Sequence, residues 1–168
     1  MRTVAVVAAA VLVLTGCTAR TGTPRPAAAP PQSAAPSLSP AGELCGEQVR
    51  TDALPEWARA GFSWDGSGTK HVYGAKGDIM AILFGYPLTS PPAPDRGNKI
   101  LWVAREPIER GGDLEIRAAL AGTTVTAERT VAGGPGPSII DLPRPGCWHL
   151  TLTWADGADS LDLTYGVP

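Results

Sequence analysis

Histidines and carboxylates are the residues of this chain that could bind a metal ion or transfer a proton. His71 and His149 are its two histidines, and they could meet in space to form such a site. His149, however, alternates with Thr151 and Thr153 along a predicted strand, which indicates a solvated face, and no cluster of Cys or Met accompanies it. We therefore predict no metal site and no catalytic histidine.

Three aspartates near the C-terminus offer a second candidate site. Asp156, Asp159 and Asp162 are spaced three residues apart and could supply oxygen ligands to calcium. Asp156 belongs to a turn signal and Asp162 alternates with leucines, so we expect a solvated strand edge instead. The glycine-rich segment 133–137 lacks the Lys-Ser/Thr pair of a phosphate-binding loop and is predicted to be a turn. These residues indicate no cofactor, and we expect a protein that is not an enzyme.

Composition excludes several classes of protein. The 168 residues contain 14 Lys and Arg against 16 Asp and Glu, which gives a formal net charge of -2. Nucleic-acid-binding domains usually carry a clustered basic excess, so this balance argues against that function. The 20 Gly and 17 Pro indicate many turns, and the composition also excludes a collagen, a coiled coil and a polytopic membrane protein.

The first seventeen residues predict the destination of the chain. Met1 and Arg2 precede an apolar run from Val4 to Leu14, which is shorter than the roughly 20 residues of a membrane-spanning helix and typical of a secretory signal. The residues that end this run, Leu-Thr-Gly-Cys17, resemble the lipobox of bacterial lipoproteins, in which the Cys thiol accepts a diacylglyceryl group. The resemblance implies a signal peptide over residues 1–16, lipidation of Cys17 and attachment to the extracytoplasmic face of the cell membrane. The alternative is an ordinary signal peptide followed by an unrelated cysteine.

Residues 17–44 are predicted to form a disordered tether between this anchor and a folded domain at 45–168. They are rich in Ala, Pro, Ser and Thr and cannot bury enough apolar surface to offset their chain entropy. Pro-rich chains are extended, at about 3.1 Å per residue, so the tether would hold the domain away from the membrane. The alternative is a segment without a role.

Cys45 and Cys147 remain once Cys17 is assigned to the lipid. An even number of cysteines in an exported, oxidising compartment favours a disulfide, with two free thiols or a metal pair as the alternatives. A bridge that closes about 100 residues would stabilise the fold by about 4–5 kcal/mol in the chain-entropy model.

The domain is predicted to be an all-β, immunoglobulin-like sandwich of seven to eight strands with one short helix. The helix is expected at 54–61, where Pro stands in the first turn and Gly at the end. Segment 113–120 alternates between apolar and polar residues, whereas 78–84 and 99–104 are apolar on both parities, as central strands are. A hairpin is expected at 154–160, with its Asp-Gly pair at the tip. The other predicted strands are 70–73, 123–129, 138–142, 148–154 and 160–167.

The same alternation predicts which way the disulfide points. Trp148, Leu150 and Leu152 share one face of their strand with Trp154, and this face must be the core because each buried side chain contributes roughly 1.5–3 kcal/mol. Cys147 has the opposite parity. We therefore expect the bridge on the outside or edge of the sheet, unlike the antibody disulfide that crosses the core.

Aromatic residues in the first half of the chain are the best candidates for a binding surface, because aromatic rings offer a large contact area at low entropic cost. An alternative interpretation makes them the core that closes one end of the sandwich. The candidates for the binding surface are Trp57, Phe62, Trp64, Tyr86 and Trp102, with Tyr73 in the same half.

A family resemblance supports this view of location and fold. The segment 144–154, Arg-Pro-Gly-Cys-Trp-His-Leu-Thr-Leu-Thr-Trp, looks like the entry to the penultimate strand of bacterial immunoglobulin-like domains. Together with segments 54–62, 98–103 and 133–138, it makes the chain similar to actinobacterial lipoproteins of uncharacterised activity that carry an immunoglobulin-like extracellular domain. The resemblance implies fold and location but no activity.

These features together favour a non-catalytic binding or accessory module of the cell envelope. Its expected partners are the membrane, through the lipid anchor, and an envelope protein or a wall glycan, with no role for nucleic acid. The alternative is a cryptic envelope enzyme or a metal-handling protein.

Replacing the lipobox cysteine tests the anchor. We expect Cys17→Ala to release the protein from membranes or to leave an unprocessed precursor, because only a thiol accepts the lipid as a thioether. Metabolic labelling with a fatty-acid analogue measures this, and equal labelling of the variant and the original chain would contradict the lipobox.

Overall fold

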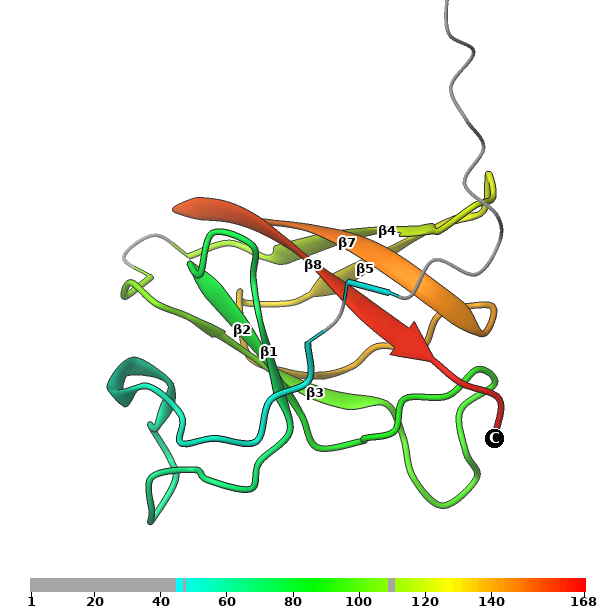
Figure 1. Cartoon of the computed structure of the whole chain (residues 1–168). Coiled ribbons are helices and arrows are strands. Elements are labelled where there is room, and N and C mark those ends of the chain that lie inside the picture. Colours follow the sequence, from blue (N-terminus) through cyan, green and yellow to red (C-terminus); the bar gives the residue numbers. More distant parts are fainter. Residues whose placement is uncertain (1–44, 47, 109–110) are drawn as a thin grey trace, which may run out of the picture. The chain divides into compact units, whose positions relative to one another are not determined.

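The computed structural model describes residues 45–46, 48–108 and 111–168. Cys17 and the predicted signal peptide and tether lie outside these residues. The described residues form a β-sandwich of two four-stranded antiparallel sheets (Figure 1), which confirms the predicted all-β class. No helix in the described ranges has the length and apolarity needed to cross a membrane.

The first sheet has the strand order β1-β2-β3-β6 and the second has the order β5-β4-β7-β8. Adjacent strands are antiparallel in both sheets. The predicted strands coincide with the observed ones to within a few residues. The bounds are β1 His71–Tyr73, β2 Ile79–Leu83, β3 Lys99–Ala104, β4 Leu114–Leu120, β5 Thr126–Val131, β6 Pro137–Ile139, β7 Gly146–Trp154 and β8 Gly157–Tyr165.

The main core lies between the two sheets. Every second residue of β4 is buried and the residues between them are exposed, as the alternation of this segment predicts. The inner face of β7 contributes Trp148, Leu150 and Leu152, all fully buried. Trp102 of β3 enters the same core from the first sheet, and its Nε1 donates a hydrogen bond to Ser138 Oγ at 3.0 Å.

Strand β2 is buried on both faces, because a second layer covers the outside of its sheet. All five of its residues are buried. Met80 and Ile82 point away from the main core and pack with Leu54 and Ala58. We call residues 50–69 the N-terminal cover, since this stretch lies across the outer side of the first sheet (Figure 1).

The helix of the N-terminal cover is shorter than predicted. It is a three-residue 3₁₀ helix, η1, at Glu56–Ala58, preceded by Pro55. The Arg59 guanidinium donates from Nε to the Leu54 carbonyl at 2.6 Å, and Gly61 then takes a φ of 89°, which favours glycine. This early reversal of the chain brings the following aromatic residues back over the sheet.

A disulfide joins Cys45 to Cys147 across 102 positions, with the two Cα atoms 5.2 Å apart. Cys147 is half-buried on the outer face of β7, whereas its neighbour Trp148 is fully enclosed in the core. The predicted pairing and the predicted register are both confirmed. The bridge fixes the start of the domain to the outside of the second sheet.

Asp159 is buried rather than solvated, which corrects the prediction of an exposed edge. Its Oδ1 accepts hydrogen bonds from the backbone N–H groups of Lys76 and Ser160, at 2.9 and 2.7 Å, and its Oδ2 accepts one from Asp78 at 2.9 Å. Lys76 and Asp78 belong to the turn between β1 and β2, so a carboxylate on β8 holds a turn of the other sheet. A Cβ at Gly74 would collide with this carboxylate, which explains the glycine there.

The hairpin between β7 and β8 is displaced by one residue from its predicted tip. Trp154 pairs with Gly157, so the two loop residues are Ala155 and Asp156. Glycine is required at 157 because a Cβ there would lie 2.5 Å from Cζ2 of the Trp154 ring. The need for glycine at position 157 therefore comes from packing against the tryptophan ring and not from a turn conformation.

The opposite orientations of Cys147 and Trp148 predict different effects of replacing them. We expect Trp148→Ala to lower the free energy of unfolding by about 3–5 kcal/mol and to change the near-ultraviolet circular dichroism, because it empties part of the core. The double variant Cys45→Ser and Cys147→Ser is expected to lose up to roughly 4–5 kcal/mol but to keep the native near-ultraviolet spectrum. Denaturant titrations and near-ultraviolet spectra of both variants test this. A near-ultraviolet spectrum that changes as much in the cysteine variant as in Trp148→Ala would contradict it.

The buried carboxylate predicts a contrast between two aspartates of one strand. Asp159→Asn is expected to lower the free energy of unfolding by about 3 kcal/mol, because an amide group would face backbone N–H donors that a carboxylate satisfies. Asp162→Asn is the matched control. It alters the partly exposed contact with His149 and should lower the free energy of unfolding by no more than about 1 kcal/mol. Denaturant titration compares them, and equal losses would be inconsistent with the role assigned to Asp159.

Candidate functional site

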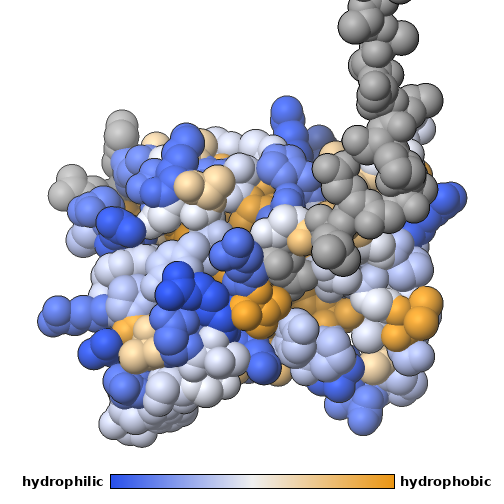
Figure 2. Space-filling view, viewed as in Figure 1, coloured by the Kyte–Doolittle hydropathy of each residue, from blue (hydrophilic) through white to orange (hydrophobic). Residues whose placement is uncertain are grey.

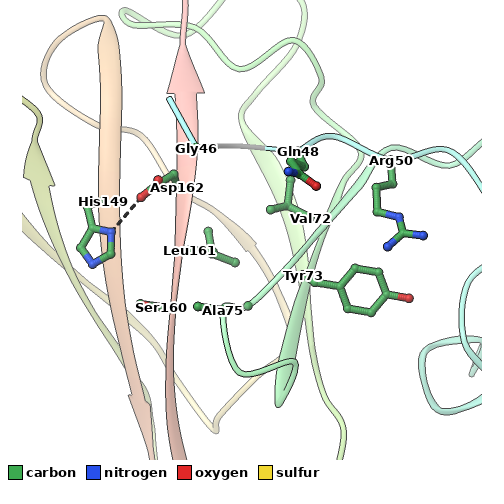
Figure 3. Close-up of a pocket in the computed structure, with 11 residues that line it drawn as sticks. Gly46, Gln48, Arg50, Val72, Tyr73, Ala75, His149, Ser160, Leu161 and Asp162 are labelled. Atoms are coloured by element: carbon green, nitrogen blue, oxygen red, sulfur yellow. Dashed lines mark hydrogen bonds and ion pairs between the residues drawn. The ribbon is translucent and has the colours of Figure 1, made fainter. Parts of the chain in front are cut away.

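A groove of about 310 Å³ opens between the edge strands β1 and β8 (Figure 3). Its apolar part is formed by Val72 of the first sheet and Leu161 of the second, both of them buried core residues. Polar side chains surround this apolar part. In the view of Figure 2, where β1 and β8 face the reader, apolar residues reach the surface in small areas between hydrophilic ones.

His149 and Asp162 form one side of the groove. They are cross-strand neighbours on β7 and β8, and His149 Nδ1 lies 2.7 Å from Asp162 Oδ1. The His149 side chain is 56% exposed, which confirms the predicted solvated position. An aspartate that orients an imidazole in this way is also a component of acid–base sites.

The disulfide lies directly beside Asp162. Ligand atoms of Cys45, Cys147 and Asp162 fall within 4.8 Å of one another, and among the described residues they are the one group of three with metal-ligand atoms so close. Both sulfurs are bonded to each other in the disulfide, so neither offers the thiolate that binds metal. The carboxylate therefore has His149 as its partner here.

Arg50 and Tyr73 form the opposite side of the groove. The guanidinium lies 5.2 Å from the centre of the Tyr73 ring and donates from Nε and Nη2 to the two oxygens of Asp52, at 3.0 and 2.8 Å. These hydrogen bonds lower the pKa of Asp52 below its usual value. The contribution of Asp52 to stability is therefore present above its unfolded pKa and is lost as the pH falls through the lower folded value.

The structure does not bring the two histidines together. His71 is fully buried on β1 of the first sheet, whereas His149 lies on the outer face of the second sheet. The Thr69 carbonyl lies 2.9 Å from His71 Nδ1 and fixes the proton there, and Nε2 lies 3.6 Å from Asp52 Oδ1 without a hydrogen bond. A shared site of both histidines is therefore excluded by their places in the fold.

Aromatic rings gather on the outside of the first sheet, beyond the area that the N-terminal cover buries. Phe62 contacts Trp64 with ring centres 5.3 Å apart, and it stacks on Phe84 at 6.3 Å. Trp64 is 53% exposed, Phe84 49% and Tyr86 40%. We call these four residues the aromatic face. Phe84 was missed in the sequence, although its parity with Met80 and Ile82 places it on this side of the sheet.

Two lysines lie over the aromatic face. Lys99 Nζ is 5.7 Å from the centre of the Phe84 ring, and Lys70 Nζ is 5.8 Å from that of Tyr86. Neither ammonium group forms an ion pair with a carboxylate of the described residues. Two ammonium groups therefore lie over aromatic rings of this face, although the chain as a whole has a formal net charge of -2.

Two of the predicted surface aromatics have other roles. Trp102 is a core residue, 1% exposed, and this corrects its place among the candidate binding residues. Trp57 is half-buried between the Tyr73 ring and the Arg105 guanidinium, where it closes the cover over the sheet. Parity within β3 explains the first case, because Trp102 alternates with the outward-facing Leu101 and Val103.

One Ser-x-x-Lys spacing, Ser67 to Lys70, precedes β1. In serine acyl-transfer enzymes this spacing brings the lysine to the serine nucleophile. Here Ser67 lies in a turn whose backbone is held by Asp65, and the Lys70 ammonium lies over Tyr86. The spacing does not form a nucleophilic pair in this fold.

Comparison with known proteins gave no match: no family model, no curated protein and no solved structure is significantly similar to the chain.

Proposed function

We propose that the protein is a lipid-anchored, extracytoplasmic binding module of the cell envelope that contacts its partner through the aromatic face. The observation that carries this proposal is the group of exposed aromatic rings beside the first sheet, in which Phe62 contacts both Trp64 and Phe84 and Tyr86 follows two residues after Phe84. Exposed apolar area on a soluble domain commonly marks an interaction site, and aromatic residues are enriched at the centres of interfaces. Ring-to-ring contacts hold Phe62, Trp64 and Phe84 against one another, which lowers the entropic cost of ordering them on binding.

The charges around the aromatic face support an anionic partner. Lys70 and Lys99 lie over its rings, and neither forms an ion pair with a carboxylate in the ranges that the structure describes. An anionic wall glycan or an acidic surface of an envelope protein would supply that charge, and sugar rings and peptide groups both pack on aromatic faces. The lipid anchor predicted at Cys17 would hold the domain where such partners are present.

Position-specific crosslinking in intact cells tests this proposal. A photoreactive phenylalanine analogue at position 84 is expected to give a discrete adduct. The same analogue at position 153, on the outer face of the second sheet, is expected to give none. Adding Trp64→Ala should reduce the adduct from position 84 at least fivefold, because the contact area is lost.

Thr151 on the outer face of the second sheet provides the control, since Thr151→Ala shortens an exposed side chain on the other sheet and should leave the adduct unchanged. Equal adducts from positions 84 and 153, or none from either, would rule the proposal out.

A further inference from the structure

The groove between β1 and β8 has the composition of a small-ligand site that is distinct from the aromatic face. Its lining comes from both sheets and from the segment that follows the disulfide (Figure 3). Ligand sites commonly combine an apolar surface with a few converging polar groups. At about 310 Å³, the groove is at the small end of such sites, and it suits one compact ring rather than a long chain.

Several polar groups in the groove have hydrogen-bonding capacity left over. Arg50 uses Nε and Nη2 for Asp52, which leaves Nη1, and Asp162 uses Oδ1 for His149, which leaves Oδ2. The Gln48 amide and the Ser160 hydroxyl also line the groove, and neither side chain is hydrogen-bonded within the described part of the chain. The groove thus presents unused donors and acceptors around an apolar centre.

The two sides of the groove carry side chains of opposite charge, and each of them already has a hydrogen-bonding partner. Arg50 is paired with Asp52 at 2.8 Å, and Asp162 is hydrogen-bonded to His149 at 2.7 Å. A simple anion would meet the Asp162 carboxylate and a simple cation would meet the Arg50 guanidinium. A purely apolar ligand would leave the polar groups desolvated and unpaired, which costs about 1–3 kcal/mol for each group.

We infer that this groove binds one ring of a neutral sugar. Sugar hydroxyls both donate and accept hydrogen bonds, so they match Gln48, Ser160 and Asp162 Oδ2 without needing a net charge. The C–H surface of the ring packs against Val72 and Leu161, which line the same groove. The ligand is therefore the end or a side unit of a neutral glycan, whatever partner the aromatic face contacts.

Nuclear magnetic resonance on the full processed protein in detergent micelles tests this inference. The probes are glucose and N-acetylglucosamine, with the zwitterionic dipeptide Ala-Ala as the competing class. At least one sugar is expected to cause saturable shifts of the amide signals of Gly74, Ser160 and Leu161. Asp162→Asn and Gln48→Ala are each expected to raise the dissociation constant at least tenfold.

Two controls keep the result interpretable. Asp95→Asn changes an exposed carboxylate in the connection between β2 and β3 and should leave binding unchanged. Crosslinking from position 84 should be the same in both groove variants, which separates this site from the aromatic face.

Three results would overturn the inference: shifts of these amides by the dipeptide but by neither sugar, no saturable shifts with any probe, or sugar affinity unchanged in both groove variants.

Discussion

Strand β2 carries five consecutive apolar side chains, and a bare two-sheet sandwich could bury only those on its inner face. The N-terminal cover removes the remaining side chains, Met80 and Ile82, from water by placing Leu54 and Ala58 over them. This requirement determines much of the structure. The short helix, the reversal at Gly61 and the turn that leads into β1 all keep the cover on the sheet. The aromatic face combines Phe62 and Trp64 of this cover with Phe84 and Tyr86, which follow β2.

Among the links that hold this arrangement to the second sheet, two lie on either side of the groove. The disulfide fixes the beginning of the described chain to β7, and the Asp159 carboxylate fixes the turn between β1 and β2 to β8. The disulfide joins β7 to the start of the segment that leads into the N-terminal cover, and Asp159 joins β8 to the turn between β1 and β2. The groove lies between these two links. Its two sides come from different sheets, and the links hold those sheets together on either side of the groove.

The sequence was informative wherever a property alternates along a single strand. Parity alone placed Trp148 inside and Cys147 outside, and it correctly separated His149 from the core. Parity could not reveal Asp159, because its burial depends on a turn some 80 residues earlier that presents two N–H groups to it. The groove was missed for the same reason, since Arg50, Tyr73 and Asp162 meet only through packing of the sheets. The exposure of Trp64 likewise depends on how the cover packs on the sheet.

The position of the disulfide has a mechanical consequence. A pull on the chain from the side that precedes Cys45 passes through the sulfur bridge to Cys147 and enters β7, which is paired on both sides with β4 and β8. When the chain is pulled between the residues that precede Cys45 and the end of β8, the segment from Gln48 to Lys70 lies outside the covalent path of the load, because the bridge bypasses it. The N-terminal cover and the aromatic face are therefore outside that path, whereas His149 and Asp162 of the groove lie on the strands that carry the load.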